Sequence, residues 1–140
     1  MSPNQIELIE NSWKFIVQNR SESGTIFYTR LFQINPELRS LFKEDIESQA
    51  QKLVALITFI VHKLNNIDDV LADVKALGER HRKYNVKPEY YGSVANALLW
   101  TLEKALGDRW TKEMEDAWVA MYLMLSRTMI EAARSQEIII

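Results

Sequence analysis

Residues that interrupt helices are scarce in this chain, which has four glycines and three prolines among its 140 residues. Few breaks leave long uninterrupted segments, and such segments favour long helices over many short strands. Within them the apolar residues recur every three or four positions, as they do on one face of a helix. The sequence therefore predicts an all-α fold of six to eight helices, in a single domain that spans residues 1–140.

The residues at the N-terminus indicate where the first helix begins. Ser2 can cap a helix, Pro3 suits its first position, and Gln5 can reach back to the cap. This helix is expected to reach about Val17, before a polar break at residues 20–23. The other helices are expected at about residues 24–34, 48–65, 69–84, 88–106 and 111–133, with a short helical turn at 36–42.

Helix-ending and helix-capping residues separate these segments. Asn35 should end the second helix, because a residue that precedes proline disfavours the helical conformation. Residues 43–47 form a charged connector, Asp68 is the expected cap of the next helix, and Asn85 and Gly107 are expected stops. The tail, residues 135–140, ends in three isoleucines, and we expect it either to dock on the domain or to fray.

Composition excludes several classes of function. The chain has no cysteine, so disulfides, thiolate metal sites and cysteine nucleophiles are ruled out. Its net charge of −2 gives little attraction for a polyanion, so we expect no nucleic-acid partner. The N-terminus lacks the pattern of a signal peptide, and the densest apolar run, Leu53 to Val61, is too short to cross a membrane. We therefore expect a soluble, cytoplasmic protein with no membrane partner.

Any histidine chemistry depends on two residues, His62 and His81. His81 follows Leu77 and Val74 at helical spacing, on an otherwise apolar face, and a neutral imidazole there could bind iron. The alternative is a core histidine that is satisfied by a hydrogen bond. His62 is nine positions after Leu53, which at about 100° per residue is half a turn away. We expect His62 at the surface, and so no metal site made of two histidines.

Several motifs occur in an order that resembles one family over nearly the full length of the chain. They are Trp13, the run Phe27–Phe32 followed by Pro36 and Leu41–Phe42, the pairs Ser48–Gln49 and Lys52–Leu53, the run Leu77–Val86, and Trp118 with Tyr122. In this order they resemble the globin family. Within it, the sequence looks most similar to single-domain bacterial haemoglobins, to the globin domain of flavohaemoglobins and to neuroglobin.

The resemblance implies a globin fold around a pocket for haem b (heme b, iron protoporphyrin IX). By this resemblance His81 is the proximal iron ligand, Phe42 packs against the haem plane, and Leu53 lies over the iron. The other residues that it implies in the pocket are Tyr28, Gln49, Lys52, Leu77, Arg80, Val86, Tyr91 and Val94. Gly24 matches the small residue where two helices cross closely, opposite Ala50.

Most of these positions also allow a simpler interpretation. Phe42, Leu53, Val86 and Val94 could be ordinary core residues, and Lys52 and Arg80 could be solvated surface charges rather than partners of haem propionates. Gln49 and Tyr28 are harder to explain in this way. A glutamine on an apolar stripe and a buried tyrosine hydroxyl both need hydrogen-bond partners.

The function implied by the resemblance is reversible binding of dioxygen at ferrous haem, with Tyr28 and Gln49 as distal donors. Each donor adds about 1 kcal/mol, so tight binding and slow release are expected. Nitric oxide and carbon monoxide are the other expected ligands. Since glutamine and not histidine occupies the distal position, we expect an open or water-bound sixth site. Nitric oxide dioxygenation would require an external reductase, because 140 residues leave no room for a flavin domain.

The oligomeric state is expected to be a monomer or a weak homodimer. Three other classes of protein are alternatives to an oxygen-binding globin. A stand-alone gas sensor would have to act through a protein partner. A haem-free signalling module with a globin fold would not require His81 to face Tyr28 and Gln49. A carboxylate di-metal bundle would need a Glu-x-x-His pair, and Gly78 stands where that glutamate would be.

Overall fold

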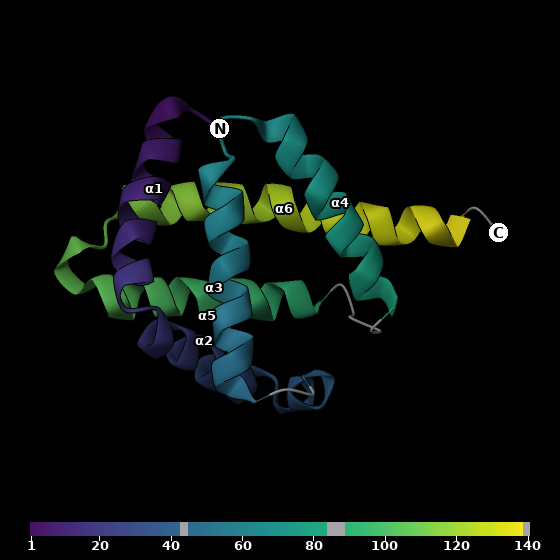
Figure 1. Ribbon diagram of the computed structural model, residues 1–140, viewed down its shortest axis with the longest axis horizontal. Coiled ribbons are helices and arrows are strands. Elements are labelled where there is room, and N and C mark those ends of the chain that lie inside the picture. The colour runs from purple at the N-terminus through teal and green to yellow at the C-terminus, as the bar shows by residue number, and fades with distance from the viewer. Residues whose placement is uncertain (43–44, 84–88, 139–140) are drawn as a thin grey trace.

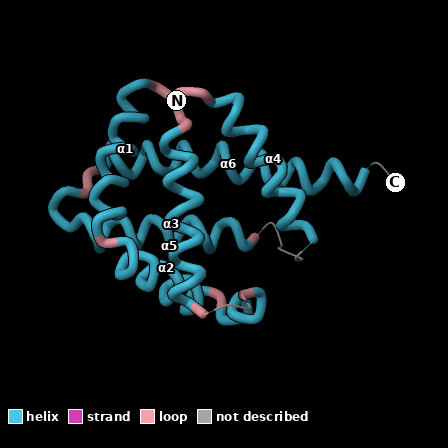
Figure 2. Tube along the Cα trace, viewed as in Figure 1, coloured by secondary structure: helices cyan, strands magenta, loops and turns pink. Residues whose placement is uncertain are grey.

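The computed structural model describes residues 1–42, 45–83 and 89–138, and within them it contains helices and no strand. The side chains of residues 67, 78–83 and 132–138 are outside this description. The α-helices are α1 (Pro3–Gln18), α2 (Arg20–Ile34), α3 (Ile46–His62), α4 (Ile67–Lys83), α5 (Tyr90–Leu106) and α6 (Lys112–Ile138), and the short 3-10 helices are η1 (Pro36–Leu41) and η2 (Gly107–Arg109) (Figures 1 and 2). The predicted all-α class is confirmed.

Helix α1 begins as its sequence predicts. The Ser2 hydroxyl accepts from the main-chain N–H of Gln5, and the Gln5 side chain accepts from the N–H of Ser2, both at 3.1 Å. This reciprocal pair satisfies two donors that the first turn of a helix otherwise leaves unpaired. The predicted ends at Asn35 and Gly107 are also confirmed, since α2 ends at Ile34 and Gly107 ends α5 with a φ of +54°.

The predicted polar break at residues 20–23 is wrong. Helix α2 begins at Arg20, with only Asn19 between it and the end of α1, and the N–H of Ser23 donates to the carbonyl of Asn19. Ser23 and Gly24 are both buried, because this part of α2 packs against α3. The polar residues at 20–23 suggested a loop, whereas Ser23 is small enough to be buried within the helix.

Other predicted boundaries shift by a few residues. Helix α3 begins at Ile46, inside the predicted connector, because the Asp45 carboxylate accepts from the N–H of Ser48 at 2.7 Å and caps the helix. It ends at His62, three residues early. Asp68 lies inside the first turn of α4 and is not its cap. Helix α5 begins at Tyr90, two residues after the predicted start at Pro88, which lies outside the described residues along with Asn85.

The C-terminal helix is longer than predicted. Its start is capped by Thr111, whose hydroxyl accepts from the N–H of Met114 at 3.1 Å. Its main chain continues to Ile138, beyond the predicted end near residue 133, although the side chains of the last turns lie outside the described residues. No helix in the described part of the chain is long and apolar enough to cross a membrane.

Two tryptophans join three helices in the core. The Trp118 indole of α6 donates to the Ser12 hydroxyl of α1 at 2.8 Å, and the Trp13 indole of α1 donates to the Thr58 hydroxyl of α3, also at 2.8 Å. The two rings lie 5.6 Å apart. Helix α3 crosses in front of α5 and α6 in Figure 1, while α4 diverges from α3 and packs on α6. Helices α3, α4 and α5 therefore border one region of the molecule on three sides.

Helices α2 and α3 cross at the predicted pair Gly24 and Ala50. A Cβ atom added to Gly24 would lie 2.3 Å from the Cβ of Ala50, far inside van der Waals contact. Glycine is therefore required by the closeness of the two main chains and not by an unusual dihedral angle. The close approach brings the middle of α2 next to the start of α3.

Candidate functional site

An aromatic cluster lies where α2 meets the end of η1. The Tyr28 side chain is buried, with only 4% exposed. Its ring packs edge-on against Phe42, with centroids 5.3 Å apart, and lies 5.9 Å from Phe32; Phe32 and Phe42 are themselves 5.7 Å apart. The three rings hold Phe42, the residue that follows η1, against α2. The site therefore begins as an apolar corner with one hydroxyl in it.

The Tyr28 hydroxyl is the polar group of this corner. It donates to the main-chain carbonyl of Gln49 at 3.4 Å, so the partner is the backbone of α3 and not the Gln49 side chain. A bond of this length is near the upper limit for a hydrogen bond and is correspondingly weak. Burial raises the pKa of Tyr28 to about 12, because the phenolate would lose its hydration there. Tyr28 thus stays a neutral donor across the physiological range, and its proton is available to a better acceptor.

Gln49 lies at the start of α3, and its side chain is half-buried. The sequence predicts that the Gln49 carboxamide needs a hydrogen-bond partner within the protein. This need is weaker than expected, because part of the side chain can reach solvent. The carboxamide offers both a donor and an acceptor beside the carbonyl that Tyr28 contacts.

The apolar residues predicted for the pocket share one property: each is half-buried and packs on the core without being enclosed by it. They are Phe42 after η1, Leu53 on α3, Leu77 on α4, and Tyr91 and Val94 on α5. Ordinary core residues of this chain, such as Val54 and Val74, are almost completely covered. Four elements therefore present apolar surface that the described part of the chain leaves partly uncovered.

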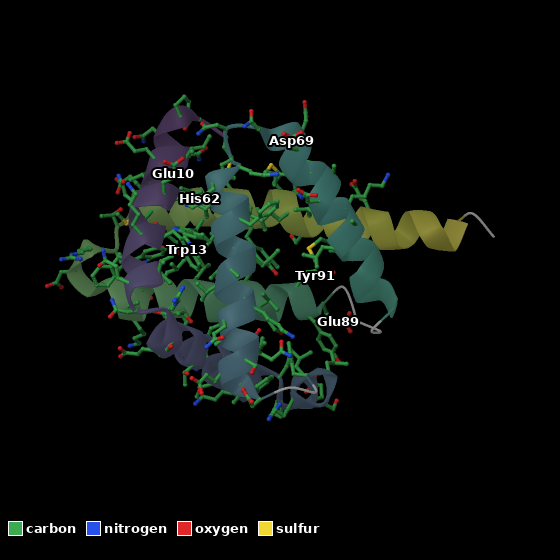
Figure 3. The ribbon with its side chains drawn as sticks, in the orientation of Figure 1. Glu10, Trp13, His62, Asp69, Glu89 and Tyr91 are labelled. Atoms are coloured by element: carbon green, nitrogen blue, oxygen red, sulfur yellow. The ribbon has the colours of Figure 1, made fainter. Side chains whose placement is uncertain are left out.

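The start of α5 is anchored by two contacts that the sequence interpretation missed. The Tyr122 hydroxyl of α6 donates to the main-chain carbonyl of Tyr91, and burial raises the pKa of both tyrosines. The Asn35 side chain at the end of α2 donates to the hydroxyl of buried Ser93. These contacts hold Tyr91 at the end of α5 that lies nearer α4 (Figure 3). Their one signal in the sequence is the presence of polar residues on otherwise apolar helix faces.

Charged and histidine residues complete the predicted set. Lys52 is exposed on α3, and His62 is exposed at the end of α3, as predicted. No group of three or more histidine, aspartate or glutamate residues within the described part of the chain could hold a metal ion. The side chains of Arg80 and His81 and the whole of Val86 lie outside the described residues, so their predicted roles stay predictions.

Comparison with known proteins gives matches over most of the chain. A model of the globin family matches residues 25–129. The flavohemoprotein of Vibrio cholerae is 31% identical over 129 residues, which are 90% of this chain and 31% of that protein. The flavohemoprotein of Bacillus subtilis is 30% identical over 128 residues, 89% of this chain and 32% of the relative. The chain thus spans about one third of these flavohemoproteins.

Two further matches extend over nearly the whole length of the related protein. The neuroglobin of Tetraodon nigroviridis is 28% identical over 146 residues, 92% of this chain and 90% of that protein. The crystal structure of a hexacoordinated heme protein from an anhydrobiotic tardigrade at pH 4 superposes with a TM-score of 0.85 and covers 96% of both chains. Its sequence identity is 20%, so this likeness concerns the fold.

Proposed function

This chain belongs to the globin family, and on that premise we propose that it binds one haem b among α3, α4 and α5 and takes up a diatomic gas on the side of Tyr28. The observation that carries the proposal is the set of half-buried apolar residues on four elements, beside one buried hydroxyl. A flat apolar macrocycle with a polar edge needs such a surface.

The described residues of the proposed site fit haem. Phe42, which follows η1, and Leu53 on α3 offer apolar surface to haem. Leu77 on α4 and the α5 residues Tyr91 and Val94 do the same. Exposed Lys52 lies one residue before Leu53, at the solvent edge, where an ammonium group can meet a carboxylate. We assign the iron ligand to His81, four residues after Leu77 on α4. When bound, haem supplies a ferrous iron with a coordination position for the gas.

Tyr28 and Gln49 are the proposed donors to the gas. A fixed donor at this position would stabilise a bound gas that carries partial negative charge, as dioxygen would. The Tyr28 ring packs against the rings of Phe27, Phe32 and Phe42. Its hydroxyl keeps its proton, and its hydrogen bond to the Gln49 carbonyl is long. Carbon monoxide carries less charge and gains less from the same donors. The pair therefore favours dioxygen and slows its release.

Nitric oxide dioxygenation is a further role for such a pocket. It consumes electrons, so it would require a reductase outside these 140 residues. The relatives that match over about one third of their length are flavohemoproteins, whose name indicates a flavin as well as a haem. An electron donor with a flavin is accordingly the partner that we propose.

Absorption spectroscopy of the purified, haem-reconstituted protein tests the proposal. We expect an intense Soret band that shifts on reduction with dithionite and again on exposure to dioxygen. Replacing the proposed ligand (His81→Gly) should weaken haem binding, with rescue by added imidazole, which supplies the missing ring.

His62→Gly is the matched control, because His62 is the second histidine and is exposed. Its spectrum should equal that of the wild type. Failure to form a Soret band after haem addition would overturn the cofactor assignment. A spectrum that depends on His62 and not on His81 would overturn the choice of ligand.

A further inference from the structure

A groove on the outer side of the molecule runs between α1 and α3. These helices pass each other in opposite directions, and the bond from Trp13 to Thr58 sets their register (Figures 1 and 3). The groove has a volume of about 570 Å³ and is lined by Val17, Arg20, Gln51, Val54, Ala55, Thr58, Phe59 and His62. From Gln51 to His62 it follows eleven residues of helix, or about 16 Å.

The middle of this groove is apolar. Val17 and Ala55 are aliphatic and reach the surface, whereas Val54 beneath them is almost completely covered. Phe59 is 42% exposed, and the Lys63 ammonium lies 4.4 Å from the centroid of its ring. Thr58 adds little polarity, because its hydroxyl already accepts from the Trp13 indole and donates to the carbonyl of Val54 at 2.7 Å. A ligand that covers these residues removes apolar surface from water without breaking a hydrogen bond.

The two ends of the groove differ in charge. Arg20 and Gln51 form one end. The ion pairs found within the described part of the chain do not include Arg20. His62 lies at the other end. Among the described residues that line the groove, none is acidic. The Arg20 end therefore favours an anion, and the Phe59 side favours an apolar tail.

We propose that this groove binds a single-chain anionic amphiphile, such as a fatty-acid carboxylate, with its head group at Arg20 and Gln51 and its tail along Val17, Ala55 and Phe59. The volume is in the range of small-molecule sites, whereas a stable protein partner needs a larger surface. The proposal concerns a face other than the haem site and does not depend on haem binding.

Calorimetric titration of the haem-loaded protein with dodecanoate, below the concentration at which it forms micelles, tests this site. Dodecanoate should bind more tightly than dodecyltrimethylammonium, which has the same tail and the opposite charge. Arg20→Gln should weaken dodecanoate binding roughly three- to tenfold, since it removes one exposed charge partner. Ala55→Trp should fill the groove and weaken binding of dodecanoate more than tenfold.

The control variant is Leu123→Ala, which removes an exposed apolar side chain from α6, where Leu123 is 45% exposed. It should bind dodecanoate as the wild type does, and circular dichroism checks that each variant keeps its helices. No binding, equal binding of both head groups, or binding that neither variant changes would each overturn the proposal. If dodecanoate shifts the Soret band equally in the wild type and in Ala55→Trp, the amphiphile binds in the haem site and not in this groove.

Sedimentation velocity distinguishes the remaining occupant, a second copy of this chain. A dimer that Ala55→Trp dissociates, together with no binding of dodecanoate, would overturn the amphiphile in favour of self-association. A monomer that binds dodecanoate through Arg20 supports the proposal.

Discussion

At the scale of single residues, Tyr28 combines a rigid ring with a hydroxyl that makes only a long, weak hydrogen bond. Contacts with Phe32 and Phe42 leave the ring little freedom, while the hydroxyl bonds the Gln49 carbonyl at 3.4 Å. A donor held in this way loses little entropy when it turns to a new acceptor. Its proposed role is therefore to stabilise a gas that carries partial negative charge.

Replacing Tyr28 by phenylalanine should accelerate dioxygen release. Loss of one hydrogen bond of about 1 kcal/mol corresponds to a roughly fivefold faster off-rate, with a smaller change for carbon monoxide. Stopped-flow displacement of dioxygen by carbon monoxide measures it. Tyr90→Phe, which removes a hydroxyl from a half-buried tyrosine at the start of α5, should leave the rate unchanged. An unaltered off-rate in Tyr28→Phe would show that this hydroxyl does not stabilise bound dioxygen.

Tyr28 should also make stability depend on alkaline pH. Burial raises its pKa to about 12, whereas an unfolded tyrosine ionises near 10. Between these values the unfolded chain loses the proton first and so binds fewer protons. The free energy of unfolding therefore falls as the pH rises from about 10 to 12, by on the order of 2 kcal/mol from this residue.

Urea denaturation at pH 9, 10, 11 and 12 measures this dependence. The slope should be smaller in Tyr28→Phe, because the variant lacks one of the groups that titrate. A residual slope is expected from Tyr122, whose pKa is also raised by burial. Equal slopes in the variant and the wild type would show that Tyr28 does not stay protonated in the fold.

At the scale of elements, the crossing of α2 and α3 depends on a missing side chain. The Cβ of Ala50 occupies the space that a Gly24 side chain would need, and a Cβ atom cannot move without its main chain. This contact places Tyr28, one turn after Gly24, next to the start of α3. The geometry of the hydroxyl thus depends on a glycine four residues away.

Gly24→Ala should destabilise the protein by about 1–3 kcal/mol, because the two helices must separate. This result opposes intrinsic helix propensity, which favours alanine by about 1 kcal/mol. Thermal unfolding measures the loss, and adding Ala50→Gly should restore most of it by returning the space. Gly92→Ala is the control, since an added Cβ there meets nothing within 4 Å. It should be neutral or stabilising, and equal losses at both glycines would contradict the packing argument.

At the scale of the whole molecule, hydrogen bonds between distant residues join the N-terminal helix to the rest. The Trp118 indole and the Ser12 hydroxyl are 106 positions apart in the sequence and both are buried. Through them α6 contacts α1, and through Trp13 and Thr58 α1 contacts α3. Helix α6 also supports α4 and the start of α5, so these bonds connect the two sides of the proposed haem site.

Ser12→Ala should lower the free energy of unfolding by about 1–3 kcal/mol, because the buried Trp118 N–H would lose its acceptor. Chemical denaturation followed by tryptophan fluorescence measures the change. Ser126→Ala is the matched control: its buried hydroxyl donates to the main-chain carbonyl of Leu123 in its own helix, and among the described residues it bonds no other element. The control should change stability by less than half as much, and an equal effect would remove the link between helices as the cause.

Properties that depend on neighbours along the chain could be predicted from the sequence. Helical periodicity, the cap formed by Ser2 and Gln5, and the stops at Asn35 and Gly107 follow from local interactions, so they were predicted correctly. The family was also evident from its ordered motifs, because these record contacts shared by the whole fold. The exposed position of His62 followed from its angle on one helix.

Features that depend on segments meeting in space required the tertiary structure. Helix α2 includes residues 20–23, and Gly24, which follows them, lies against Ala50. The Tyr28 hydroxyl bonds a main-chain carbonyl, which no side-chain pattern can reveal. The groove beside Arg20 exists because α1 and α3 are antiparallel in one register. Such features arise from distances between atoms far apart in the chain, and a linear pattern contains no such distances.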